Sequence, residues 1–166
     1  MKTLVVDTDV ISYLFKGDSR AAVYRQHLQN ATPLVSFMTV AELEYWALIR
    51  NWGEATRQRM QTHLSAYTQI MPDSEMCRLW AEVYLSVNSS GRKISVQDAW
   101  IAATAISYQV PLVTHNRKDY AIVSGLTLIQ EKASISGKAR TAATSTTSAT
   151  TNIMIGIRCG SNNQHD

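Results

Sequence analysis

The chain has 166 residues, a length that suits a single domain with its own hydrophobic core. Residues 1–131 hold 12 basic and 12 acidic residues and residues 132–166 hold 4 and 1, so the net charge of +3 comes from the C-terminal segment and does not by itself indicate a polyanionic partner. The two cysteines show no metal-ligand or disulfide spacing and no stretch approaches the roughly 20 apolar residues of a membrane span, so we expect a cytoplasmic protein.

The first part of the chain predicts two short buried strands, each followed by a helix. Residues 4–6 form a short apolar strand that stops at Asp7, and helical spacing of apolar residues then continues to about Gly17. A second helix is predicted over 19–29 and a second strand over 34–38. Thr39 and Glu42 have the spacing of a capping box, so we expect the next helix to begin there with Glu42 in its first turn.

The second part of the chain continues the alternation of helices and strands. Helices are predicted over 54–69 and 73–88, a second capping box runs from Ser95 to Asp98, and strands are predicted over 110–114 and 126–129. Short apolar strands alternating with helices are typical of an α/β fold with a parallel sheet, here of about four to five strands, covered by helices on both faces. Residues 132–166 are rich in Ser, Thr and Ala, and we predict a disordered tail there.

Three acidic residues, Asp7, Glu42 and Asp98, stand where a predicted strand gives way to a helix or in a predicted first turn. Ligands of parallel α/β sheets bind beyond the carboxyl ends of the strands, so we expect these side chains, with Asn116 after the third strand, to converge. Carboxylates held together repel each other, and a divalent cation relieves the repulsion. The pattern predicts a site for Mg²⁺ or Mn²⁺ that hydrolyses phosphodiester bonds.

Other interpretations of the same acids remain open. Glu42 and Asp98 each occupy the third position of a capping box, and Asp7 can cap the helix that follows it. Asp119 lies where a turn residue is expected. The order Asp7, Thr, Asp9 after a strand is also typical of phosphatases in which the first Asp is the nucleophile and the second the general acid, although no lysine motif or acidic pair further along completes that set.

Four segments, in this order and spacing, resemble PIN-domain ribonucleases and, within them, the VapC-like toxins of bacterial type II toxin–antitoxin modules. They are residues 4–12 (LVVDTDVIS), 36–43 (SFMTVAEL), 98–105 (DAWIAATA) and 112–120 (LVTHNRKDY). The resemblance covers residues 1–131 and implies a three-layer PIN-like nuclease domain. It further implies a Mg²⁺-dependent endoribonuclease in which Asp7 and Asp98 bind the metal and Glu42 helps to orient or deprotonate the water.

The chain departs from the family pattern at two positions. Many members carry Asn where this chain has Asp9, and many carry a fourth carboxylate where this chain has Asn116, so the number of metal ions is open here. Asn116 remains a candidate catalytic residue, and Asp9 and Asp119 are candidate accessory groups. Because Asn116 replaces a carboxylate, an alternative function remains open. In that alternative the protein is a PIN-like module that binds RNA or protein and has little catalytic turnover.

The resemblance also implies the partners of the protein. They are an RNA substrate, a cognate antitoxin protein and a second copy of the chain in a homodimer, with no membrane involved. Two basic pairs flank the acidic segments, and we predict that they contact substrate phosphates, while solubility is the alternative role. The pairs are Arg92 with Lys93 and Arg117 with Lys118.

Overall fold

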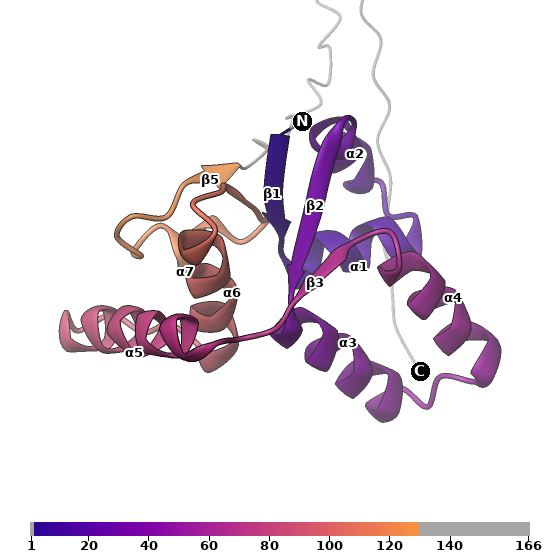
Figure 1. Cartoon of the computed structure of the whole chain (residues 1–166). Coiled ribbons are helices and arrows are strands. Elements are labelled where there is room, and N and C mark those ends of the chain that lie inside the picture. Colours follow the sequence, from indigo (N-terminus) through magenta and orange to yellow (C-terminus); the bar gives the residue numbers. More distant parts are fainter. Residues whose placement is uncertain (1, 130–166) are drawn as a thin grey trace, which may run out of the picture. The chain divides into compact units, whose positions relative to one another are not determined.

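The computed structural model of the protein describes residues 2–129 (Figure 1). Within these residues there are five strands: β1 (Lys2–Val6), β2 (Ala31–Ser36), β3 (Thr68–Ile70), β4 (Leu112–Val113) and β5 (Leu128–Ile129). The same residues form seven helices: α1 (Thr8–Lys16), α2 (Ala21–Leu28), α3 (Phe37–Ile49), α4 (Glu54–Leu64), α5 (Ser74–Ser89), α6 (Val96–Ser107) and α7 (Arg117–Tyr120).

The strands form one parallel sheet in the order β3-β2-β1-β4-β5. Strand β1 lies at the centre and pairs with β2 on one side and β4 on the other. The chain order reverses at this point, and in α/β sheets the carboxyl ends of the strands at such a switch point form the ligand site. Asp7 directly follows β1 and Thr114 directly follows β4, so both lie at this edge.

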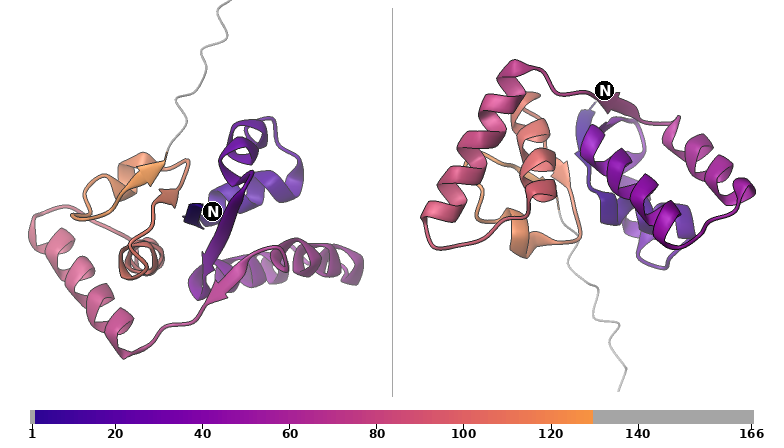
Figure 2. Two further views of the ribbon diagram at one scale, coloured as in Figure 1. Left: turned by 45° about the horizontal axis from the view of Figure 1, so that its top comes forward. Right: turned by 90° about the horizontal axis from the view of Figure 1, so that it is seen from below.

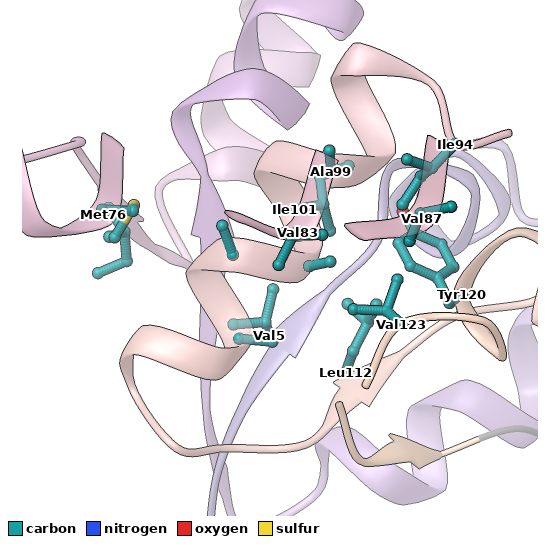
Figure 3. Packing of buried hydrophobic residues seen from close by; sticks show 14 of the residues in the cluster. Val5, Met76, Val83, Val87, Ile94, Ala99, Ile101, Leu112, Tyr120 and Val123 are labelled. Carbon is teal, nitrogen blue, oxygen red and sulfur yellow. The ribbon is translucent and has the colours of Figure 1, made fainter. Parts of the chain in front are cut away.

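Alternating side chains of the central strands enter two different cores, so the sheet is buried on both faces. Val5 packs with residues of α5, α6 and α7, among them Val83, Ile101 and Tyr120 (Figure 3). Leu4 and Val6 pack in the other core with residues of α1, α2, α3 and α4. Figures 1 and 2 show α5, α6 and α7 grouped on one side of β1 and β2, and α1 to α4 on the other. The result is three layers, helix on sheet on helix.

Local signals in the sequence account for the ends of several helices. Helix α1 ends at Gly17, whose φ of 68° places it in the left-handed conformation that glycine adopts without steric cost. Helix α5 begins after Asp73, whose Oδ1 accepts a hydrogen bond from the Met76 N–H at 2.8 Å. These caps satisfy backbone groups that would otherwise lack partners at the helix ends.

The structure confirms the predicted parallel sheet of four to five strands with helices on both faces. The predicted boundary between strand 34–38 and the following helix was wrong, because α3 begins at Phe37 with Ser36 as its N-cap. Strand β3 and helix α7 were not predicted from the sequence.

No helix among residues 2–129 has both the length and the apolar character needed to cross a bilayer. The predicted boundary of the nuclease domain at residue 131 and the predicted disorder of 132–166 both lie outside the described residues.

Candidate active site

Asp7 lies where β1 ends and α1 begins, and its side chain is almost fully buried. Its Oδ1 accepts a hydrogen bond from the Thr8 N–H at 2.8 Å, so the side chain caps α1. Its Oδ2 accepts a second bond, at 2.6 Å, from the hydroxyl of Thr114 at the end of the neighbouring strand β4. Thr114 therefore holds the Asp7 carboxylate from across the switch point of the sheet.

Asp98 lies in the first turn of α6, where the predicted capping box is present. The Ser95 hydroxyl accepts a hydrogen bond from the Asp98 N–H at 2.9 Å and donates one to Asp98 Oδ2 at 2.6 Å. In the usual box the acid reaches back to the N-cap N–H, whereas here it accepts from the N-cap hydroxyl. The contact fixes one oxygen of Asp98 and leaves the other to face the site.

A single hydroxyl joins Asp7 to Asp98. Tyr120, on α7, is 1% exposed, and its OH donates to Asp7 Oδ1 at 3.1 Å and to Asp98 Oδ1 at 3.0 Å. Both carboxylates thus lie within hydrogen-bond reach of one oxygen atom, although they are far apart in the sequence. Burial raises the pKa of Tyr120 well above its ordinary value, and the charges of Asp7 and Asp98 raise it further, so the hydroxyl keeps its proton.

Glu42 lies in the second turn of α3, because that helix begins at Phe37 rather than at the predicted position. It therefore does not occupy the third position of a capping box, and its alternative interpretation as a cap is wrong. Its Oε2 accepts a hydrogen bond from the Thr8 hydroxyl at 2.6 Å, one residue after Asp7. The hydroxyl of Thr39, the expected N-cap, lies 3.1 Å from that of Thr8. Thr8 thus places Glu42 beside the Asp7 segment.

Asp9 and His115 form the next contact along this edge. The His115 N–H donates to Asp9 Oδ2 at 3.1 Å, while Asp9 Oδ1 is buried and accepts no hydrogen bond within the described part of the chain. The His115 ring lies edge-on to Tyr13 and is hydrogen-bonded through Nδ1 to the Tyr24 hydroxyl at 2.7 Å. A buried carboxylate oxygen without a partner is a costly arrangement that a bound cation or water relieves.

Asn116 and Asp119 lie close to the site but face each other. The Asn116 side-chain amide donates to Asp119 Oδ2, and the Asn116 backbone N–H donates to the Thr114 hydroxyl at 2.9 Å. Asn116 thus supports the residue that holds Asp7, while its side-chain amide is engaged by Asp119. Within the described residues, the hydrogen bonds of the Asn116 and Asp119 side chains join them to each other and not to Asp7, Glu42 or Asp98.

Burial and mutual repulsion dominate the electrostatics of the acids. Burial raises the pKa of Asp7 well above its ordinary value, and the negative charges of Asp9 and Asp98 raise it further. Burial also raises the pKa of Asp9. The pKa of Glu42 is raised first by burial and then by the charges of Asp98 and Asp9. Among residues 2–129 no lysine or arginine forms an ion pair with these acids. The negative charges therefore accumulate without a cationic side chain to balance them.

The carboxylate oxygens of the site are the type of ligand that a hard divalent cation prefers, although they do not form a complete ligand set by themselves. No three His, Cys, Asp or Glu side chains among residues 2–129 are grouped as a ready set of metal ligands. Mg²⁺, however, is usually bound through one or two carboxylates, several waters and the phosphates of a substrate. Asp7 and Asp98, joined through Tyr120, are such a pair, and the unpartnered oxygen of Asp9 adds to the local negative charge. The residues therefore fit a cation that keeps part of its water shell.

The two predicted basic pairs are exposed beside this edge. Arg92 and Lys93 precede α6, and Arg117 and Lys118 begin α7. In the described residues, none of the four side chains makes a hydrogen bond or an ion pair. Their charged groups remain free for an external partner, and their contact with RNA stays a prediction.

The comparison with known families identifies the fold. A match to the PIN domain covers residues 4–125, most of the chain. The chain belongs to the PIN-domain family. Ribonuclease VapC1 of Haemophilus influenzae (strain R2866) is 28% identical to this PIN domain over 124 residues, which cover 74% of this chain and 92% of the relative. The resemblance predicted from the four sequence segments is confirmed.

Solved structures agree with the PIN fold. VapBC2 from Rickettsia felis, bound to a DNA fragment from its promoter, matches with a TM-score of 0.70 and 22% identity, covering 78% of this chain and 99% of that one. A toxin–antitoxin complex from Klebsiella pneumoniae matches with a TM-score of 0.60 and 25% identity, covering 75% and 95%. Both matches support the fold, and the second neighbour is itself a toxin–antitoxin complex.

Several polar residues of the site were not found from the sequence of this PIN domain. Thr8 and Thr114 each donate a side-chain hydrogen bond to one of the acids, Tyr120 donates to two, and the His115 backbone N–H donates to Asp9. Thr114 carried a signal, because it ends a predicted strand at the same edge as Asp7. Tyr120 ends the fourth resembling segment, but its contact with the acids was not predicted, because the one-turn helix that places it was missed.

Proposed function

We propose that this PIN-domain protein is a Mg²⁺-dependent endoribonuclease that hydrolyses RNA phosphodiester bonds as the toxin of a toxin–antitoxin system. The proposal rests on one observation above all. Asp7 and Asp98 share a hydrogen-bond donor at the switch point of the sheet, with Glu42 beside them and no lysine or arginine paired with these acids among residues 2–129. The similarity to ribonucleases named VapC supports RNA as the substrate.

The residues divide the chemistry between them. Asp7 and Asp98 would hold the cation, Mg²⁺ or Mn²⁺, which when bound polarises a phosphate oxygen and lowers the pKa of a coordinated water. Glu42 is fixed through Oε2 by Thr8, while Oε1 accepts no hydrogen bond within the described residues. Burial raises the pKa of Glu42, and a raised pKa favours the uptake of a proton from the attacking water through Oε1.

The test is cleavage of a structured RNA by the full chain with Mg²⁺, with excess EDTA, and with the variants Asp7→Asn and Asp98→Asn. We expect EDTA and either substitution to stop cleavage. Asp73→Asn is the matched control, because Asp73 caps α5 through a similar contact and Asn preserves such caps. Cleavage that survives EDTA, or both site substitutions, contradicts the proposal.

The same experiment addresses the alternative of a binding module with little turnover. That alternative gains support from Asn116, whose side chain is turned to Asp119 instead of the acids. It predicts that RNA binds to the unmodified protein but is not cut at any Mg²⁺ concentration. The phosphatase alternative predicts burst formation of an aspartyl-phosphate on a small phosphomonoester, and none of the relatives named above is a phosphatase.

The partners follow from the same family. We assign the nuclease domain to residues 1–131 and place its activity in the cytoplasm with the RNA substrate. A cognate antitoxin is expected because the Klebsiella pneumoniae neighbour is a toxin–antitoxin complex. Co-expression with the product of an adjacent small reading frame should relieve growth arrest and yield a stable complex. The homodimer stays a prediction, which sedimentation of the purified chain tests.

A further inference from the structure

The Tyr120 hydroxyl is the only group of the described chain that hydrogen-bonds to both Asp7 and Asp98. The Tyr120 ring is fixed by packing, since it lies in the core with Val87, Leu112 and Val123 (Figure 3). Tyr120 is buried, and within the described chain its hydroxyl donates only to the two carboxylates. The position of the Tyr120 oxygen therefore sets how far apart Asp7 and Asp98 lie.

The hydrogen bonds also determine which carboxylate oxygens remain open. A carboxylate offers roughly four lone-pair sites. Asp7 Oδ1 accepts from the Thr8 N–H and from Tyr120, so both of its sites are used, while Oδ2 accepts only from Thr114. Asp98 Oδ1 accepts only from Tyr120, and its Oδ2 accepts only from Ser95. Each carboxylate thus keeps an open site while the Tyr120 contacts stay intact.

We propose that Tyr120 is a positioning residue, whose hydroxyl holds Asp7 and Asp98 at the spacing at which one divalent cation can be bound by both. The inference rests on the proposed function and names a residue that the acidic pattern alone does not. Tyr120 acts through the two acids and does not itself touch substrate. Its hydroxyl also lowers the repulsion between the acids when no cation is bound, because it gives both negative charges one shared donor.

The experiment compares Tyr120→Phe with the unmodified full chain. Phenylalanine fills the same core volume and removes only the shared donor. After the protein is stripped with EDTA, Mn²⁺ affinity is measured by titration calorimetry, and cleavage is followed against Mn²⁺ concentration. We expect the dissociation constant to rise about 10-fold, the lower end of the effect typical for residues that hold metal ligands. Cleavage should recover at saturating Mn²⁺, which a misfolded site could not do.

Two controls separate this inference from the proposed function. Tyr67→Phe removes a hydroxyl that contacts His63 instead of the acids, and it should leave the dissociation constant unchanged. Asp98→Asn should abolish both Mn²⁺ binding and cleavage. If Asp98→Asn does so while Tyr120→Phe binds Mn²⁺ as the unmodified chain does, the role of Tyr120 is overturned and the nuclease stands. If Asp98→Asn changes neither binding nor cleavage, both are overturned.

A loss of folding in Tyr120→Phe is also informative. Binding of Mn²⁺ to the folded state raises the melting temperature, so the variant's affinity can be obtained from melting curves at increasing Mn²⁺. A curve displaced to about 10-fold higher Mn²⁺ supports the inference. A chain that stays unfolded at every Mn²⁺ concentration overturns it, because the hydroxyl would then serve the fold and not the spacing of the acids.

Discussion

Helices α3 and α6 each carry one acidic side chain to the same edge of the sheet, but they hold it by different means. In α6, Asp98 lies in the first turn, and the N-cap residue Ser95 bonds both its N–H and its carboxylate. In α3, the N-cap is Ser36, and Glu42 lies a turn further along, where no cap can reach it. Glu42 is held instead by Thr8, which belongs to α1.

The difference separates a local contact from a tertiary one. One carboxylate oxygen of Asp98 is fixed within four consecutive residues, and the same contacts stabilise α6, so a structural role and a role in the site coexist there. Glu42 has no structural role of this kind, because it does not cap a helix. Its burial disfavours the charged form and raises its pKa. A partly buried acid without a cap or a cationic partner costs stability, and a role in the chemistry is the reason we assign to it.

The largest expected effect tests whether both acids serve the chemistry. Glu42→Gln and Asp98→Asn should each lower RNA cleavage by at least about 100-fold, more than the loss of a group that only supports a metal ligand. Their effects on stability should differ, because Asp98 also belongs to a cap. In EDTA, Asp98→Asn should lose about 0.5 kcal/mol and Glu42→Gln should lose nothing. Cleavage assays and urea denaturation provide the two measurements.

Glu44→Gln is the matched control for this comparison. Glu44 lies on the exposed side of the same helix, two residues from Glu42, so the substitution should change neither cleavage nor stability. If Glu42→Gln cleaves RNA as well as Glu44→Gln does, Glu42 has no role in the reaction and the contrast between α3 and α6 loses its functional meaning.

The second effect concerns Asp7, which combines a cap with deep burial. Its pKa is raised above the ordinary 3.8 by burial, then by Asp9 and Asp98, so the metal-free folded state binds the proton more tightly than the unfolded state. The contribution of Asp7 to stability is therefore fully present below pH 3.8 and is lost as pH rises through the raised pKa. Each unit of such a shift corresponds to about 1.4 kcal/mol.

Asp7→Asn removes this titration, so in EDTA the variant should be more stable than the unmodified protein at pH 7 and should depend less on pH. Urea denaturation between pH 5 and 8 measures the stability at pH 7 and its dependence on pH. Ordinary carboxyl groups titrate at about pH 4, below this window, so they contribute little to the change. Asp18 does not interfere, because its bonds to Arg20 lower its pKa. A variant that is less stable at pH 7 and equally dependent on pH shows that capping by Asp7 outweighs its burial.

A third prediction uses the charge around the two helices. Two exposed basic residues precede α6 and two more begin α7, whereas none lies in β2 or the first turn of α3. Reversing Arg92 with Lys93, or Arg117 with Lys118, to Glu should weaken RNA binding in EDTA. If both members of a pair contact phosphates, the slope of log affinity against log salt should fall by about 1.4 for single-stranded RNA.

The matched control reverses the exposed residues Lys16 and Arg25, on α1 and α2, which changes the net charge equally. If the control and the two test variants lose the same RNA affinity, the loss is due to the total charge of the protein, and the two basic pairs do not contact RNA phosphates directly. Unchanged binding in the test variants rejects them as phosphate contacts.

The parts of the fold that could be predicted are those set by local sequence. Strand β1, helix α1 and the box of α6 follow from apolar runs, a glycine C-cap and a serine N-cap. Strand β3 and helix α7 were missed because they have three and four residues, too few to show a hydrophobic period. The start of α3 was misplaced because both Ser36 and Thr39 are good N-caps, and only the tertiary contact of Thr39 with Thr8 decides between them.

The same division applies to the candidate site. Asp7 and Asp98 were found because each also has a local role, at a strand end or in a cap. The hydroxyls that hold them could not be found in this way, since Thr114 and Tyr120 reach Asp7 across the sheet from distant parts of the chain. The side-chain direction of Asn116, toward Asp119, is set by a contact that no spacing rule specifies.

The smallest expected effect compares the two N-caps directly. Ser36→Ala removes the cap of α3, whose hydroxyl lies 3.3 Å from the Met38 N–H, and Ser95→Ala removes the cap of α6. Each should cost about 1 kcal/mol of unfolding free energy. Only Ser95→Ala should also lower cleavage and Mn²⁺ affinity, because of these two N-cap residues only Ser95 bonds an acid of the site. If the two variants lose equal stability and equal activity, cleavage follows the stability of the fold, and the Ser95 contact does not position Asp98.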